Sequence, residues 1–70
     1  MGDFQRNDLV ELIGTFHSMD PATGSPIPYP VGYRFKYNAP DPHLPECSQV
    51  TDIQRNTFVD HVPDKLLKKV

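Results

Sequence analysis

The sequence predicts an all-β protein: a small SH3-like barrel of about five short antiparallel strands with a long proline-rich loop. The chain has 70 residues, and its eight prolines and four glycines divide it into short extended stretches. The clearest stretch, residues 31–37, alternates apolar and polar side chains, which is typical of a half-buried strand. Closing short strands into a barrel removes exposed sheet edges, and an OB-fold would normally need a longer chain.

The first expected strand covers residues 9–16. Its apolar face would hold three residues: Val10, Leu12 and Phe16. Residues 18–28 read as a turn, because an Asp-Pro pair starts it and Gly24 allows a positive φ. Together with the strand at 31–37, this pattern predicts a hairpin with a long tip.

The strand at residues 31–37 has one aromatic face and one cationic face. Five odd-numbered residues form the apolar face: Tyr29, Val31, Tyr33, Phe35 and Tyr37. Gly32, Arg34 and Lys36 form the other face. Two prolines precede Val31, where they would mark the start of the strand without removing a ladder hydrogen bond.

The second half of the chain predicts a loop, a strand and a short last element. Residues 38–49 contain three prolines, so we expect irregular structure there, and we place the loop of the domain at 39–50. We expect residues 51–59 to contain a strand, with Phe58 on one face and Ile53 and Val59 on the other. Residues 62–70 form either a last strand or a single helical turn that starts after Pro63.

Length and composition indicate one domain, residues 1–70, with an irregular segment at 1–8. A chain this short hides only about 60% of the surface that its unfolded form exposes, so small domains usually need a staple or a partner. Cys47 is the only cysteine, which excludes an internal disulfide. The formal net charge of −2 argues against a protein devoted to nucleic acid. We find no apolar run of about 20 residues for a membrane span and no targeting-peptide pattern.

The sequence favours no catalytic, cofactor or metal site. His43, Cys47 and His61 could ligate a metal, but they lack the paired cysteines that make a zinc signal strong. Cys47 and His61 could also act as nucleophile and base, which would need a shaped pocket and a third, orienting group. Turn chemistry and solvation account for the carboxylates Asp20, Asp41 and Glu46. We therefore expect a protein that is not an enzyme.

Five cations offer two interpretations. They are Arg34, Lys36, Lys65, Lys68 and Lys69. Such residues often lie on solvated faces. They could equally form a local positive surface that steers an acidic partner. The aromatic face of the 31–37 strand could stack single-stranded nucleic acid, but core packing is the favoured use of that face.

Three segments, "IGTFHSMD", "PYPVGYRFKYN" and "NTFVDHVPDKLLKKV", resemble subunit IV of the photosystem I reaction centre (the PsaE family). The first motif matches at Gly14, Thr15, Ser18 and Asp20. The second matches at Tyr29, Pro30, Val31, Arg34, Phe35 and Asn38. The third matches at Asn56 and Phe58, with Leu66 or Leu67 and Val70 closing it. The resemblance covers residues 13–70.

The chain departs from the family pattern at two places. Family members begin with a basic strand and an aromatic segment, whereas this chain begins with the shorter, acidic "MGDFQRNDLVEL". We therefore expect the first strand of the barrel to be missing, shortened or supplied by a neighbour. The loop at 39–55 also differs from the family's Gly/Ser-rich loop, which indicates a divergent member.

The resemblance implies a five-stranded SH3-like barrel without a cofactor. It also implies a protein peripheral to the thylakoid membrane, on the stromal side in a chloroplast or on the cytoplasmic side in a cyanobacterium. The implied partners are other photosystem I subunits, the membrane core and acidic ferredoxin; nucleic acid is not among them. The implied roles are assistance in ferredoxin docking and in cyclic electron flow. Arg34 occupies the family's ferredoxin-contacting position, and we expect it to bind the partner with Lys36, Tyr33 and Asn38. An alternative is a small β-barrel that binds protein or nucleic acid, because "YPVGY" also resembles the FYRN segment of chromatin regulators.

Overall fold

The computed structural model describes residues 4–20 and 22–70, and the chain is all-β, as predicted. All strand pairs in it are antiparallel. The elements, in chain order, are β1 (Leu9–Leu12), β2 (Phe16–Met19), β3 (Pro26–Tyr29), β4 (Arg34–Pro40), β5 (Cys47–Asp52), β6 (Thr57–Pro63), the 3-10 turn η1 (Asp64–Leu66) and β7 (Leu67–Lys69).

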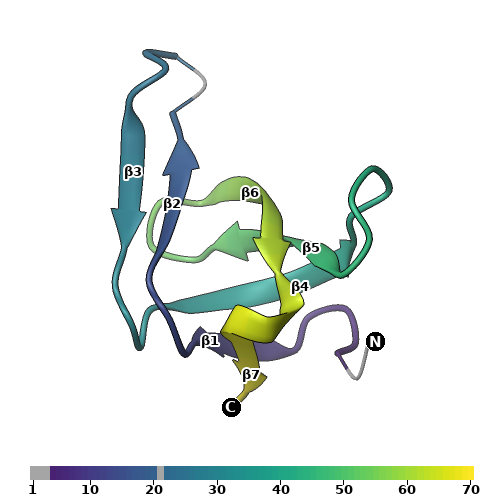
Figure 1. Ribbon diagram of the computed structural model, residues 1–70. Helices are drawn as coiled ribbons and strands as arrows, with labels where there is room; N and C mark the ends of the chain where they lie inside the picture. The colour runs from purple at the N-terminus through teal and green to yellow at the C-terminus, as the bar shows by residue number, and fades with distance from the viewer. Residues whose placement is uncertain (1–3, 21) are drawn as a thin grey trace.

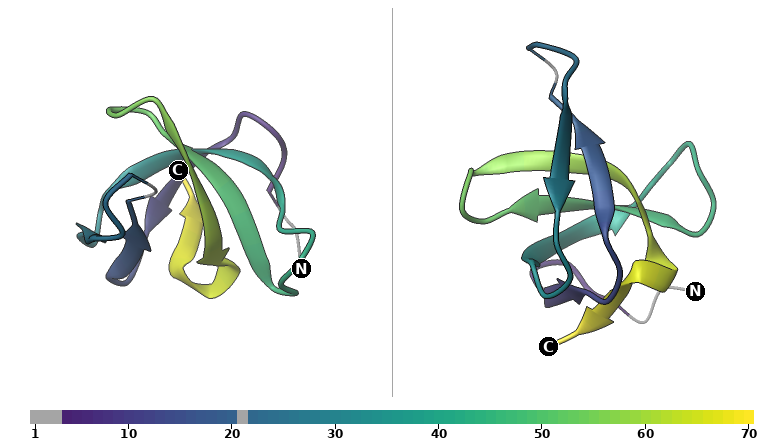
Figure 2. Two further views of the ribbon diagram at one scale, coloured as in Figure 1. Left: turned by 90° about the horizontal axis from the view of Figure 1, so that it is seen from above. Right: turned by 60° about the vertical axis from the view of Figure 1, so that its left-hand side comes forward.

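Five strands form one curled sheet in the order β6-β5-β4-β1-β7, and β2 and β3 form a separate two-stranded ribbon (Figure 1). The ribbon protrudes from the body and crosses over β6 (Figure 2). Five curled antiparallel strands agree with the predicted small β-fold. Within the described residues no strand pairing joins β6 to β7, so backbone hydrogen bonds leave the sheet open rather than closing it into a barrel.

The core lies on the inner face of the curl. Strand alternation places Phe35 and Tyr37 of β4 inside, while Arg34 and Lys36 point out. The buried apolar residues are Val10, Leu12, Tyr29, Phe35, Tyr37, Val50, Val59, Val62 and Leu67. Every strand of the sheet contributes at least one of them, so the core itself holds the curl together.

The strand predicted at 9–16 is two strands with a bend between them. β1 ends at Leu12, and the chain bends at Ile13 and Gly14 before β2. A Cβ atom on Gly14 would lie 2.8 Å from Cδ2 of Leu66, so the bend packs closely against η1. Because β1 pairs with both β4 and β7, the chain supplies a first strand itself, and it has only four residues.

The strand predicted at 31–37 begins later than expected. The amide of Tyr33 donates to the carbonyl of Pro30 at 3.2 Å, and Gly32 has a φ of +91°, so this segment is a turn. Val31 is 60% exposed, so the prediction that it lies on the buried face of the strand is wrong. The strand proper runs from Arg34 to Pro40 because the backbone regains an extended conformation only after Gly32.

Part of the turn predicted at 18–28 is strand. β3 carries Pro26 and Pro28, and it pairs only with β2 in the described residues, so the missing N–H groups fall on an edge. The connection between β2 and β3 keeps part of the predicted turn chemistry, while Pro21 of the Asp-Pro pair lies outside the described residues. Gly24 has a φ of +73°, and Oδ1 of Asp20 accepts the amide of Ala22 at 2.8 Å.

The segment 51–59 contains strand residues as predicted, but they belong to two strands: the end of β5 and the start of β6, with a turn at 53–56 between them. Val59 is buried, while Phe58 and Ile53 are exposed. The predicted loop at 38–49 is shortened to 41–46, since β4 and β5 extend into it from both sides. Both alternatives for the last element occur: η1 follows Pro63, and β7 follows η1.

Candidate functional site

The outer side of β7, β1 and β4 carries a charged row. Antiparallel register sets Glu11 of β1 opposite Arg34 of β4 and Lys68 of β7. Nε of Arg34 lies 3.2 Å from Oε1 of Glu11, and Nζ of Lys68 lies 3.6 Å from Oε2. The side chain of Arg34 remains 54% exposed. Strand β4 therefore presents Arg34 outward, with one carboxylate shared between it and Lys68.

Lys36 extends this row by one step. It lies across from Leu9 on one side and Thr51 on the other, and it is exposed. Over residues 4–20 and 22–70, no carboxylate lies within 4 Å of its ammonium group. We call these four residues, Glu11, Arg34, Lys36 and Lys68, the charged outer face.

Two other predicted cations lie apart from the charged outer face. Lys69 pairs with Asp8, with Nζ and Oδ2 separated by 3.6 Å. Lys65 lies on η1 beside a surface hollow lined by Glu46 and Cys47. The structure thus divides the five cations of the sequence into a row of three and two outliers.

Asn38 and Tyr33, the other predicted partner-binding residues, have internal partners. Oδ1 of Asn38 accepts the hydroxyl of Thr51 at 3.0 Å, next to a break in the β4–β5 register. The hydroxyl of Tyr33 donates to Oδ1 of Asp52 at 2.7 Å, and its ring lies edge-on to Tyr29 at 4.8 Å. Asn38 therefore helps to fix β5 against β4, and Tyr33 ties the turn before β4 to the core.

The buried carboxylate of Asp52 is a feature that the sequence did not reveal. It is fully buried, and Tyr29 and Tyr33 donate their hydroxyls to it at 2.9 and 2.7 Å. The amides of Gln54 and Arg55 also donate to it, at 3.1 and 3.2 Å. An aspartate just before a turn was a local signal for the two amides, but the two tyrosines come from distant positions.

The same contacts change the acidity of both tyrosines. Burial, followed by the hydrogen bond to Asp52, raises the pKa of Tyr29 to about 12. Burial and the bond to Asp52 also raise the pKa of Tyr33. Both phenols therefore stay protonated as donors to Asp52 at neutral pH.

A second buried carboxylate, Asp41, holds the 41–46 loop. It accepts the amides of His43, Leu44 and His61 at 2.8, 3.3 and 3.1 Å, and it also contacts Nδ1 of His61. The hydrogen bond from His43 is the largest factor that lowers the pKa of Asp41, opposed by its burial and aided by His61. Both His61 and Glu46 have positive φ angles, so the loop and β6 meet in tight backbone conformations.

The structure does not unite the metal-ligand candidates His43, Cys47 and His61. In the part of the chain that the structure describes, no group of three His, Cys, Asp or Glu side chains could hold a metal ion. His61 is engaged with Asp41. Burial, reinforced by Asp41, Asp64 and Glu46, raises the pKa of the Cys47 thiol, which disfavours the reactive thiolate.

The aromatic face, for which nucleic-acid stacking was the less favoured interpretation, is turned inward. Tyr29, Phe35 and Tyr37 are buried in the core, where Tyr29 and Phe35 pack edge-on with ring centres 5.1 Å apart. Their faces are therefore used for packing, as the sequence favoured.

Comparison with known proteins returned no relative: no family model matches the chain, and neither a curated protein nor a solved structure is similar to it. Over the described residues, no helix is long and apolar enough to cross a membrane.

Proposed function

We propose that this protein is a non-catalytic docking subunit whose charged outer face binds an acidic protein. The supporting observation is the alignment of Arg34, Lys36 and Lys68 on three adjacent strands around a single carboxylate, Glu11. Three cations against one carboxylate make this face locally positive on a chain whose formal net charge is −2. A positive face on an otherwise acidic protein orients an approaching negative partner.

The motif resemblance gives this proposal its specific form: an extrinsic accessory subunit of photosystem I that assists ferredoxin docking and cyclic electron flow. In this form the protein is peripheral to the thylakoid membrane and contacts the other acceptor-side subunits and the membrane core. Arg34 supports it, because the residue at the resembling position points outward. The partner's own acidic surface would supply the complementary charge, and the protein would need no cofactor.

The test is the association rate with ferredoxin when the charged outer face is altered. Arg34→Gln and Lys36→Gln should each slow association about two- to fivefold at low salt, because electrostatic steering acts mainly on the on-rate. The difference should shrink at physiological salt, where the screening length is about 8 Å. Stopped-flow kinetics over a range of ionic strength measures both effects.

Lys65→Gln is the matched control, since it removes one positive charge away from the charged outer face. It should leave the association rate close to that of the wild type. Equal slowing in all three variants would mean that only net charge matters, and unchanged kinetics in Arg34→Gln would remove Arg34 from the mechanism. Co-purification with chlorophyll-containing complexes tests the photosystem assignment separately.

A further inference from the structure

A second surface, on the edge strand β6, carries an exposed aromatic side chain. Phe58 is 80% exposed, and Met19 of β2 is 65% exposed. Phe58, Met19 and Ser18 line two adjoining hollows between the ribbon and β6, with volumes of about 410 and 470 Å³. Single exposed apolar residues are common, but here an exposed aromatic ring, a second exposed apolar side chain and two hollows lie together.

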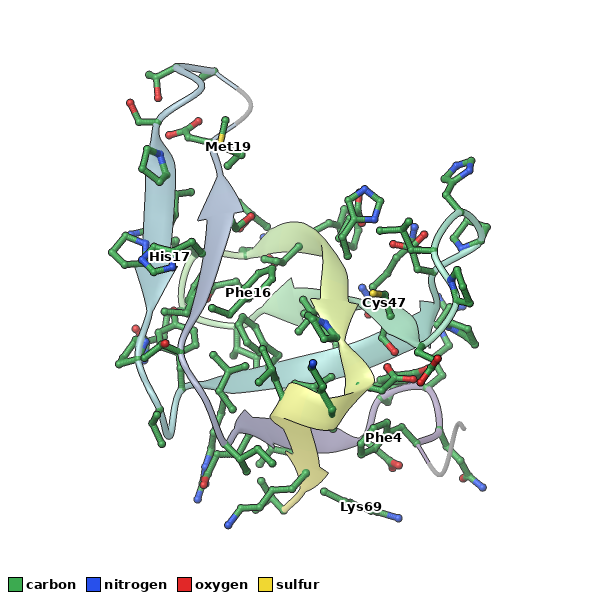
Figure 3. All side chains as sticks on the ribbon, viewed as in Figure 1. Phe4, Phe16, His17, Met19, Cys47 and Lys69 are labelled. Carbon is green, nitrogen blue, oxygen red and sulfur yellow. The ribbon has the colours of Figure 1, made fainter. Side chains whose placement is uncertain are left out.

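The ribbon shapes this surface. Strand β2 crosses β6, and its side chains alternate, so that Phe16 points toward the body while His17 points away (Figure 3). Phe16 packs on Tyr29, with ring centres 6.5 Å apart, and this contact anchors the ribbon to the core. The floor of the first hollow is thereby fixed by the fold.

An unpaired carboxylate lies two residues beyond the ring. Asp60 lines the same hollow as Phe58 and is exposed. Among the described residues it has no cation within 4 Å, whereas Asp8, just before β1, has one and Glu11 of β1 has two. Of the nearby basic groups, His61 is bound to Asp41, and Arg6 lines a third hollow with Phe58 and Asp60 without forming an ion pair. We name Phe58, Asp60, Ser18 and Met19 the Phe58 surface.

We propose that the Phe58 surface binds an extended segment of a partner protein that carries an apolar side chain and a lysine or arginine two residues apart. Phe58 and Asp60 are exposed on either side of buried Val59 and line the same hollow, so they share one side of β6, and this repeat spans roughly 6.6 Å along a strand. An extended segment beside β6 has the same repeat. Its apolar side chain would cover Phe58, and its cation would meet the unpaired carboxylate of Asp60. This contact would fasten the subunit to its assembly and leave the charged outer face free.

The experiment is selection of random nonapeptides displayed on phage against the immobilised full chain, followed by calorimetry with the consensus peptide. The expected consensus is an apolar residue and a Lys or Arg separated by one position. Phe58→Ser should weaken binding of that peptide tenfold or more, as truncation of a central aromatic does. Asp60→Asn should weaken it about threefold and remove most of its salt dependence.

Ile53→Ser is the matched control, because Ile53 is an exposed apolar residue in the β5–β6 turn that does not line these hollows. Circular dichroism should show all three variants folded, since each side chain is exposed. An acidic consensus, or no consensus, would overturn the proposal. So would self-association of the wild type in analytical ultracentrifugation that Phe58→Ser abolishes, since the occupant would then be a second copy of this chain.

Discussion

At the scale of single residues, Asp52 links more of the fold than any other polar side chain in the described residues. It receives two phenol hydroxyls and two backbone amides, and it lies where β5 turns toward β6. A buried carboxylate is tolerated only when its oxygens are fully hydrogen-bonded. The four donors satisfy this condition, and the carboxylate in turn is the acceptor that each of these donors uses.

Asp52→Ala should therefore destabilise the protein strongly, by about 3 kcal/mol, because four donors lose their acceptor in the interior. Asp52→Asn should cost less, about 1 kcal/mol, since an amide can keep the Oδ1 contacts and donate to Tyr29 instead. Urea denaturation followed by tyrosine fluorescence measures both. Equal losses in the two variants would contradict this ranking and show that the donors require the charged carboxylate itself.

The raised pKa of Tyr29 predicts a specific alkaline weakness. Between its ordinary value near 10 and about 12 in the fold, the unfolded chain releases the phenolic proton while the folded protein keeps it. The folded state then binds more protons, so stability is fully present below pH 10 and declines as the pH rises toward 12. Urea midpoints from pH 8 to 11 should fall less steeply in Tyr29→Phe than in the wild type. Parallel curves would assign the alkaline loss to other groups, such as the lysines.

At the scale of elements, the bend at Gly14 sets the angle between the sheet and the ribbon. Gly14→Ala should destabilise the protein by about 1 kcal/mol, because the new methyl group would meet Cδ2 of Leu66 at 2.8 Å and that side chain must move. Leu66→Val removes this methyl group. In a double-mutant cycle the two changes should therefore cost less together than the sum of the single changes. Strict additivity would contradict a clash between the two residues.

The sequence predicted the elements whose patterns are local and missed those that depend on distant partners. Alternation in β4 correctly placed Phe35 and Tyr37 inside and Arg34 outside. The start of that strand was misplaced because Gly32 adopts a positive φ while its amide donates to Leu12, a contact across the hairpin. The β5–β6 turn at residues 53–56 contains neither glycine nor proline, so only Asp52 before it and Asn56, with a φ of +56°, gave a local hint.

In the candidate site too, local patterns predicted some residues, while the arrangement that depends on distant strands was missed. Cations on the outer side of a strand can be read from alternation, so Arg34 and Lys36 were found. Their row with Lys68 depends on β7 pairing with β1, which no local pattern specifies. Phe58 was matched to a family motif, but its exposure at an edge is a property of sheet order.

At the scale of the whole molecule, the two proposed surfaces differ in charge and position. The charged outer face lies on β7, β1 and β4, and the Phe58 surface lies between β6 and the ribbon, at the opposite edge of the sheet. A 70-residue domain has limited stability of its own, so contacts with a larger assembly would add to it by mass action. The Phe58 surface can then bind the assembly while the charged outer face binds an acidic protein transiently.

A substitution of Glu11 tests whether the two surfaces bind independently. Glu11 is the one carboxylate in the charged outer face, and it pairs with both Arg34 and Lys68. Glu11→Gln should speed association with an acidic partner about two- to fivefold at low salt, the opposite of Arg34→Gln, because removing the negative charge strengthens steering. Stability should change by less than about 1 kcal/mol, since surface ion pairs contribute little. Binding of the consensus peptide at the Phe58 surface should stay the same. Slower association in Glu11→Gln would mean that the ion pairs position the cations, and the partner would then recognise the Glu11–Arg34 pair rather than free positive charge.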